Sequence, residues 1–223
     1  ALQLSTAERD HLYQLAGLLP PSNGVISEHI PPGMQRLLNR LGPQTPVAVF
    51  AADWQLVWWN AAWASLLGDP NGVAPEERNL VHLYFGRGAA EPSALGWPIV
   101  SADSEATTRA IVADLRRASA RYPSDARLRK LIDRQLAASP EFARLWHQGG
   151  VGGHAEERKT IHHPQVGEIT VDCDVLVDTD TDLKIVVYTV EPGSDDQSKL
   201  ELALVTGGQS LARSAPGGRS RKD

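Results

Sequence analysis

Cysteine is almost absent from this sequence, which has one, at position 173. That scarcity excludes a disulfide framework and a cysteine-based zinc finger. The sequence also lacks any run of about 18 apolar residues, the length that a membrane-spanning helix needs. The opening residues ALQLSTAERD have neither the basic nor the apolar segment of a secretory signal. We therefore predict a protein of the reducing cytoplasm, with no membrane partner.

Recognised catalytic motifs are missing as well. The sequence contains no G-x-S-x-G, S-x-x-K, H-E-x-x-H or phosphate-binding P-loop. The glycines near position 150 do not complete G-x-G-x-x-G, because Ala155 stands where the last glycine belongs. The sequence thus predicts no catalytic residue and no cofactor, and we expect a protein that is not an enzyme.

Metal-binding patterns are present only in part. Residues 178–182, DTDTD, resemble the start of a calcium loop, but Leu183 and Thr189 occupy the positions of its glycine and its last acidic ligand. A solvated hairpin turn is therefore the favoured interpretation. His162 and His163 are neighbours, and neighbouring strand residues point to opposite faces, so they do not chelate one ion. We predict no metal site, and expect one buried and one exposed histidine.

Charge and composition limit the remaining classes. The formal net charge of -5 argues against strong nucleic-acid binding by the chain as a whole. A hydrophobic content of 42% is too high for wholesale disorder, and 223 residues are enough for one substantial domain.

Tryptophan, by contrast, is concentrated. The chain has six Trp against three Phe and four Tyr, and four of the six lie within ten residues: Trp54, Trp58, Trp59 and Trp63. We expect much of the aromatic burial in one hairpin and in the helix that follows it.

Hydrophobic periodicity and capping signals predict the elements of the first half of the chain. Asn60 is a candidate N-cap, and Pro75 begins a helix whose first turn carries two acids. The predicted elements are helices over 5–17 and 32–41, strands over 45–50 and 56–59, and helices over 60–67 and 75–85.

The second half reads as helices followed by strands. Helices are predicted from Ser104 to Ala120, from Ser124, and from Ser139 as N-cap. From Arg158 the period changes to two, and Cys173 falls on the apolar face, where a thiol is a poor nucleophile. Residues 183–190 are apolar on both faces, as in a central strand. A last helix is predicted over 198–205. The pattern predicts an α+β fold of PAS type, with a five-stranded antiparallel sheet and helices packed on one face.

Five segments in this order also resemble one known family. They are TPVAVFAADWQLVWWNAAWASLLGD, PEERNLVHLYF, SPEFARLWHQGGV, HHPQVGEITVDCDVLV and LKIVVYTVEPGS. Over roughly residues 30 to 206 the chain resembles the ligand-binding domain of MmyB-like transcription regulators, which are XRE-type helix-turn-helix proteins of bacteria. LSTAERDHLYQLAG resembles the last helix of that family's DNA-binding domain. The resemblance divides the chain into that helix (1–19), a linker (20–29), the PAS-like domain (30–206) and a disordered tail (207–223).

The resemblance implies a function and a set of positions. It implies a PAS-like interior that holds a small, largely apolar ligand, with fatty acids as precedent. It further implies a homodimeric regulator whose ligand state alters DNA binding through the helix-turn-helix domain, which is mostly missing from this chain. The family motifs map onto nine candidate ligand-binding residues: Trp58, Trp59, Asn60, Arg78, Asn79, Phe85, Trp146, His163 and Tyr188.

Alternatives stay open at this point. Arg78 could pin a helix through Glu76 or Glu77, or it could hold an acidic head group. The domain could be a ligandless PAS-like dimerisation module whose interior is filled by tryptophan. Less favoured is an enzyme that uses the His162/His163 region.

Overall fold

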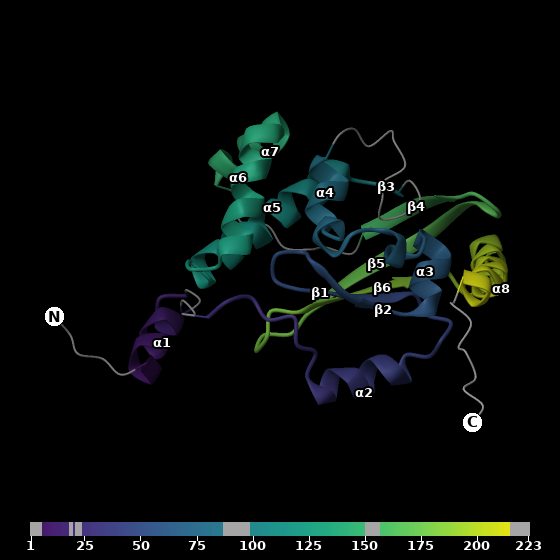
Figure 1. Cartoon of the computed structure of the whole chain (residues 1–223), viewed down its shortest axis with the longest axis horizontal. Coiled ribbons are helices and arrows are strands. Elements are labelled where there is room, and N and C mark those ends of the chain that lie inside the picture. Colours follow the sequence, from purple (N-terminus) through teal and green to yellow (C-terminus); the bar gives the residue numbers. More distant parts are fainter. Residues whose placement is uncertain (1–5, 18–19, 21–23, 87–98, 150–156, 215–223) are drawn as a thin grey trace, which may run out of the picture.

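The computed structural model describes residues 6–17, 20, 24–86, 99–149 and 157–214 (Figure 1). An antiparallel sheet organises these residues, with its strands in the order β2-β1-β6-β5-β4-β3. They are β1 (Val47–Phe50), β2 (Leu56–Trp59), β3 (Ile99–Ser101), β4 (Glu157–His163), β5 (Gly167–Val177) and β6 (Lys184–Thr189). The predicted interior position of the strand over 183–190 is confirmed, because β6 lies between β1 and β5.

Eight α-helices accompany the sheet in the described ranges. They are α1 (Thr6–Leu15), α2 (Pro32–Arg40), α3 (Ala61–Leu67), α4 (Leu80–Phe85), α5 (Ser104–Arg121), α6 (Ala126–Ala138), α7 (Pro140–Gln148) and α8 (Asp195–Ser214). Two short 3-10 helices, η1 (Pro70–Gly72) and η2 (Pro75–Glu77), lie between α3 and α4. The antiparallel sheet and these helices confirm the α+β class. None of the helices in these ranges is both long and apolar enough to cross a membrane.

The predicted number of strands was wrong, because the sheet has six strands and not five. The additional strand, β3, pairs with β4 at the edge of the sheet, with Ile99 opposite Ile161. A strand of three residues is too short to show an alternating pattern, so the sequence carried no signal for it. Residues 87–98, which precede this strand, lie outside the described residues.

The prediction that helices pack on one face only was also wrong. The larger core lies between the sheet and α3 to α8, and it includes Phe50, Trp63 and Val186. A second apolar cluster, which we call the α2 cluster, covers the opposite face. Its buried members are Ile30, Leu38, Val47, Val49, Leu183 and Ile185. Figure 1 shows α2 on the side of the sheet away from α4–α7. All four residues of β1 are buried, and such a strand needs a cover on both faces.

Side-chain caps begin most of the helices. Asn60 accepts a hydrogen bond from the backbone N–H of Trp63 (2.9 Å), and Ser139 accepts one from Phe142 (3.2 Å), so both predicted N-caps are confirmed. Helix α6, predicted to start at Ser124, starts at Ala126 with Asp125 as its cap. The predicted continuous helix over 75–85 was wrong: it is broken at Arg78 and Asn79, and α4 starts again with Asn79 as its own cap.

Helix α8 packs against α3 at the end of the sheet. At Gly207 the two helices leave no room for a side chain, because an added Cβ atom would lie 2.5 Å from the Cβ atom of Ser65. The helix starts at Asp195 and runs to Ser214, beyond the predicted 198–205 and into the segment expected to be a disordered tail. Two acids in its first turn favour the earlier start, because they complement the positive end of the helix dipole. Residues 215–223 lie outside the described residues.

Candidate functional site

A cavity lies in the larger core, between the sheet and helices α4 and α5. Its walls come from the six strands β1–β6, from α3–α5 and from the β1–β2 turn. The lining residues are Phe50, Trp54, Leu56, Trp63, Leu67, Leu80, Leu83, Tyr84, Ile99, Thr107, Ile111, Glu157, Lys159, Cys173, Val175, Val186 and Tyr188. The interior therefore contains the hollow that a PAS-like ligand domain is expected to have.

The hollow is small. Its volume is about 50 Å³. One water needs roughly 10–15 Å³ on this measure, and an apolar cavity of about 150 Å³ holds benzene. The cavity thus has space for a few waters or a small group of atoms, and a larger ligand has to move part of the wall.

Most of that wall is aromatic and aliphatic. The ring of Trp63 stacks on the ring of Tyr188, with their centroids 5.1 Å apart. Phe50 contacts Trp63 at 6.0 Å and Trp54 at 5.5 Å between ring centroids. Interlocked rings of this kind make a stiff wall on the side of β1 and β6. Because α4 has six residues and β3 is a three-residue edge strand, the opposite side is less firmly held.

One part of the wall is polar, and it carries a buried lysine. Lys159 of β4 is 6% exposed, and its Nζ donates a hydrogen bond to the Tyr84 hydroxyl at 3.1 Å. The same Nζ lies 3.3 Å from a carboxylate oxygen of Glu157. A lysine is almost never buried in this way unless it is paired. Lys159 and Glu157 therefore form an ion pair in the wall of an otherwise apolar cavity.

The second oxygen of Glu157 is also in use. It accepts a short hydrogen bond from the hydroxyl of Thr107 on α5. Burial disfavours the charged form of Lys159, but the acidic groups of Tyr188, Tyr84, Cys173 and Glu157 outweigh burial, so the pKa of Lys159 lies above its ordinary value. We refer to Tyr84, Thr107, Glu157 and Lys159 as the polar end of the cavity.

Cys173 and Tyr188 line the cavity next to this polar end. Burial raises the pKa of the Cys173 thiol, although nearby Lys159 acts in the opposite direction. Burial likewise raises the pKa of the Tyr188 hydroxyl. Both groups are therefore neutral near pH 7, and the predicted interpretation of Cys173 as a core thiol of low nucleophilicity is confirmed.

Tyr188 lines the cavity, whereas the other eight predicted ligand-binding residues do not belong to its lining. Trp58 packs against the α2 cluster on the opposite face of the sheet, since neighbouring strand residues alternate. Trp59 lies beneath the guanidinium of Arg78, whose Cζ is 5.5 Å from the centroid of the Trp59 ring. Arg78 also donates from Nε to the backbone oxygen of Val73 at 2.8 Å. These contacts, and not Glu76 or Glu77, hold Arg78 in place.

Asn60 and Asn79 use their side chains to hold the backbone. Besides capping α3, Asn60 donates to the carbonyl of Thr45 (2.6 Å). Asn79 donates from Nδ2 to the carbonyl of Asp53 (3.0 Å) and accepts from the backbone N–H of Val81 (2.9 Å). Asn60 thus ties the segment before β1 to the start of α3, and Asn79 ties the β1–β2 turn to the start of α4.

The predicted aromatic residues of α4 and α7 form a separate stack. Phe85 meets Phe142 edge to face at 5.1 Å between centroids, and Phe142 stacks on Trp146 at 5.7 Å. This stack joins α4 to α7 behind the cavity wall, so its effect on a ligand is indirect.

The two neighbouring histidines occupy different environments. His163 is buried, its Nε2 lies 3.1 Å from the carbonyl oxygen of Ser65, and its Nδ1 accepts from the N–H of Gln165 at 3.3 Å. Burial lowers the pKa of His163, with the Ser65 carbonyl opposing the shift. His162 is exposed and pairs with Glu168 at 3.3 Å. The predicted pair of one buried and one exposed histidine is confirmed. Over the described ranges, no three His, Cys, Asp or Glu side chains gather closely enough to hold a metal ion.

The polar end was missed at the level of sequence, although one signal for it was present. In β4 the buried positions are Lys159, Ile161 and His163, which alternate with exposed or half-buried residues. A lysine at an inward position of an alternating strand indicates a buried charge that needs a partner. Its partners Tyr84 and Thr107 come from distant parts of the chain and carry no such signal.

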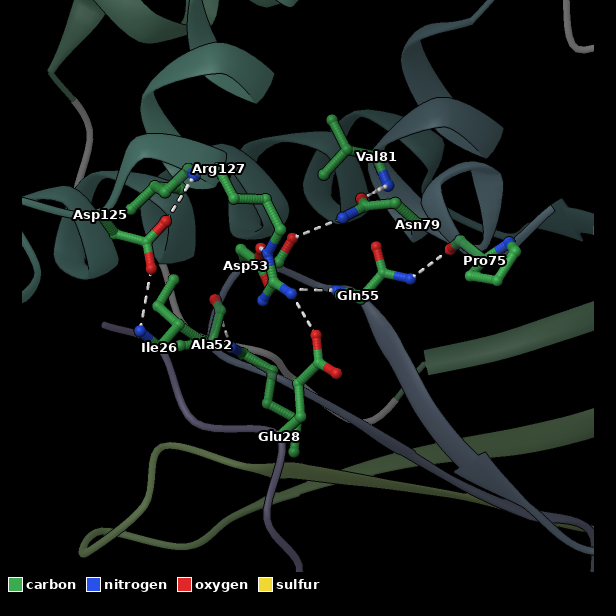
Figure 2. A network of polar contacts seen from close by, with 12 residues as sticks. Ile26, Glu28, Ala52, Asp53, Gln55, Pro75, Asn79, Val81, Asp125 and Arg127 are labelled. Carbon is green, nitrogen blue, oxygen red and sulfur yellow. Dashed lines mark hydrogen bonds and ion pairs between the residues drawn. The ribbon is translucent and has the colours of Figure 1, made fainter. Parts of the chain in front are cut away.

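A second buried ion-pair network lies where the N-terminal segment meets the domain (Figure 2). The carboxylate of Asp53, in the β1–β2 turn, is fully buried and accepts a hydrogen bond from Nε of Arg127 at 2.9 Å. Arg127 also binds Glu28. Asp125, the cap of α6, accepts from the backbone N–H of Ile26 at 2.9 Å. Residues 26–28 are thereby fixed to α6 and to the β1–β2 turn.

That turn also reaches the cavity. Trp54 follows Asp53 directly, lines the cavity, and has the unusual positive φ of 64°. Its indole Nε1 donates to the carboxylate of Asp114 at 3.1 Å, and the ammonium of Lys184 lies 4.8 Å from its ring centroid. A positive φ in a bulky residue costs of order 1–3 kcal/mol and persists only where its surroundings enforce it. Trp54, which lines the cavity, and its neighbour Asp53, which binds Arg127, thus connect the cavity with the N-terminal segment.

Comparison with known families decides what kind of domain carries this cavity. The model of the MmyB-like transcription regulator ligand binding domain matches residues 30–203, which is most of the chain. The chain belongs to this family. The MmyB-like match covers every residue that lines the cavity, and it identifies a domain of transcription regulation and ligand binding, which implies a non-enzymatic role. A comparison with curated proteins found no match.

Proposed function

We propose that this domain senses a small, largely apolar molecule in the cavity between the sheet and α4, and that occupancy alters DNA binding by a helix-turn-helix domain of the same regulator. The observation that carries the proposal is an apolar cavity with one buried ion pair in its wall, in a family of regulator ligand-binding domains. Ligand sites have this composition: mostly apolar, with a few polar groups that orient the ligand.

The size of the cavity limits what binds without rearrangement. A long fatty acid needs far more than about 50 Å³, so it would have to displace α4 or β3. Each buried methylene contributes about 0.8 kcal/mol, so a chain of moderate length offers enough free energy to move a six-residue helix. We therefore propose a ligand with an alkyl part, of which fatty acids are one class, and a wall that adjusts to it.

The route from ligand to DNA would run through the β1–β2 turn. A ligand that moves the ring of Trp54 shifts Asp53, its neighbour in the chain, and Asp53 holds Arg127 and with it Glu28. Residues N-terminal to Glu28 lead toward the helix α1. We propose that this network passes ligand occupancy to the DNA-binding domain of a homodimer.

A second candidate function is a ligandless dimerisation module. The observation that favours it is the same small volume, together with the stacked rings of Trp63 and Tyr188 in the cavity wall. In that case no small molecule would raise the melting temperature of the domain through the cavity.

A pocket-filling variant separates the two functions. We expect Val186→Leu to add a methylene inside the cavity and to abolish the rise in melting temperature that octanamide or octanoate gives in the wild type. Val187→Leu is the matched control, because Val187 packs against the α2 cluster on the other face, and it should keep the ligand response. If the two variants respond like the wild type, or if neither probe shifts the wild type, the sensing function is wrong.

A further inference from the structure

The polar end of the cavity contains one cation and one carboxylate among the described lining residues. These are Lys159 and Glu157, 3.3 Å apart, with side chains that are 7% and 18% exposed. Their charges cancel, so the cavity wall as it stands is close to neutral. The near-neutral wall affects whether a charged or a neutral head group binds more tightly. This inference rests on the proposed function.

Hydrogen-bonding capacity remains at both members of the pair. The ammonium of Lys159 has three N–H donors, and the described residues supply two oxygen partners, Tyr84 and Glu157. The carboxylate of Glu157 has about four acceptor positions, and Thr107 and Lys159 occupy two of them. A head group can thus receive a hydrogen bond from Lys159 and donate one to Glu157.

A carboxylate ligand meets an electrostatic obstacle here. It would place a second negative charge beside Glu157 in a nearly dry site with one cation, and two carboxylates that share such a site do not both stay ionised. Lys159 is already paired with Glu157, so its charge compensates little of the free-energy cost of removing a second carboxylate from water. A neutral head group avoids this cost because it adds no charge.

We infer that the ligand of this domain is a neutral amphipathic molecule whose head group presents a carbonyl oxygen to Lys159 and an N–H or O–H donor to Glu157, as an amide does. The alkyl part lies against Trp63, Ile111 and Val186 in the apolar wall. Thr107 and Tyr84 are positioning residues, which hold the carboxylate and the ammonium in place.

Octanamide and octanoate test this inference, because they have the same length and shape and differ in head-group charge. Isothermal titration calorimetry of the whole chain at pH 7.5 should show octanamide binding about tenfold or more tightly than octanoate. In Glu157→Gln the charge of Lys159 becomes available, and the order should reverse. In Lys159→Met both probes should bind weakly. The control Glu168→Gln removes an exposed carboxylate on β5 and should behave like the wild type.

A measurement on the wild type alone keeps the test valid if a variant fails to fold. Lowering the pH from 7.5 to 6.5 raises the neutral fraction of octanoic acid about tenfold, so its apparent affinity should rise about tenfold while that of octanamide stays constant. Octanoate that binds as tightly as octanamide, with no dependence on pH, would overturn the neutral-head inference and leave the sensing function intact. Absence of binding by both probes would overturn both.

Discussion

Two ion-pair networks of this domain, each with buried members, use the same chemistry in different surroundings. At the N-terminal segment, Arg127 joins Asp53 and Glu28, and Asp53 also accepts from the backbone of Gln55 at 3.3 Å (Figure 2). There Asp53 is fully buried, whereas the side chains of Arg127 and Glu28 are 43% and 48% exposed, and none of the three lines the cavity. At the polar end of the cavity, Lys159 and Glu157 border open volume. Burial of a charged group alone therefore does not indicate a ligand site. The feature that distinguishes the Lys159–Glu157 pair from the Arg127 network is the cavity beside it.

The surroundings also divide the expected roles. Arg127 joins the β1–β2 turn to Glu28, and Asp125 binds Ile26, so the first network stabilises the fold and the position of residues 26–28. Lys159 and Glu157 lie two residues apart on one strand, so their ion pair joins no distant segments, and one hydrogen bond from each links them to α4 and α5. We expect substitutions in the first network to affect stability most, and substitutions in the second to affect ligand binding most.

The largest effect on stability should follow from Arg127→Ala. It leaves the fully buried carboxylate of Asp53 without its cation, and breaking a buried pair in this way costs about 3 kcal/mol of unfolding free energy, the lower part of the usual range, because the guanidinium is partly exposed. Urea denaturation measures the loss. Arg134→Ala is the control: its pair with Glu77 spans 3.6 Å on the surface and should contribute less than about 1 kcal/mol. Equal losses in both variants would remove the distinction between the networks.

A smaller effect is expected at the cavity. The double variant Lys159→Met, Glu157→Gln removes both charges together and should lie within about 1 kcal/mol of the wild type, since replacing a whole buried pair by uncharged groups is often neutral. The same variant should lose the response to octanamide. A loss of stability as large as that of Arg127→Ala would show that the pair is structural, and the polar end would then not be a ligand site.

The smallest effect concerns pH, and it tests whether burial alone perturbs a group remote from both networks. Burial lowers the pKa of His163 below its ordinary value of 6.5, so the unfolded chain binds more protons between the two values. The free energy of unfolding should therefore fall as the pH drops below about 6.5, and His163→Gln should make that fall shallower. Burial lowers the pKa of His82 in the same direction, so some slope remains. Melting curves of His163→Gln and of the exposed-site control His162→Gln should differ; identical slopes would contradict this assignment.

The sequence predicted the elements better than the site, for a physical reason. Alternation and caps are local signals, and they located β4, β5, β6 and the start of α3 at Asn60. The site depends on contacts between distant residues: Lys159 with Tyr84 across 75 positions, and Glu157 with Thr107 across 50. No local pattern encodes such pairs.

The family motifs likewise identified residues that hold the fold together better than they identified the residues that line the cavity. They marked residues such as Asn79 and Trp58, whose side chains cap a helix and pack against α2. These motif positions are therefore structural requirements of the fold. Tyr188 differs from them, because it is a motif residue that lines the cavity.

Methyl-resolved NMR of the domain during titration with octanamide tests the central claim most directly, because it compares the two apolar clusters in one experiment. The account predicts that the methyl signals of Ile111, Leu83 and Val186, which line the cavity, shift with saturable dependence on octanamide. The signals of Val49 and Leu183, in the α2 cluster, should stay in place. Shifts confined to the α2 cluster, or no shifts at all, would contradict the account.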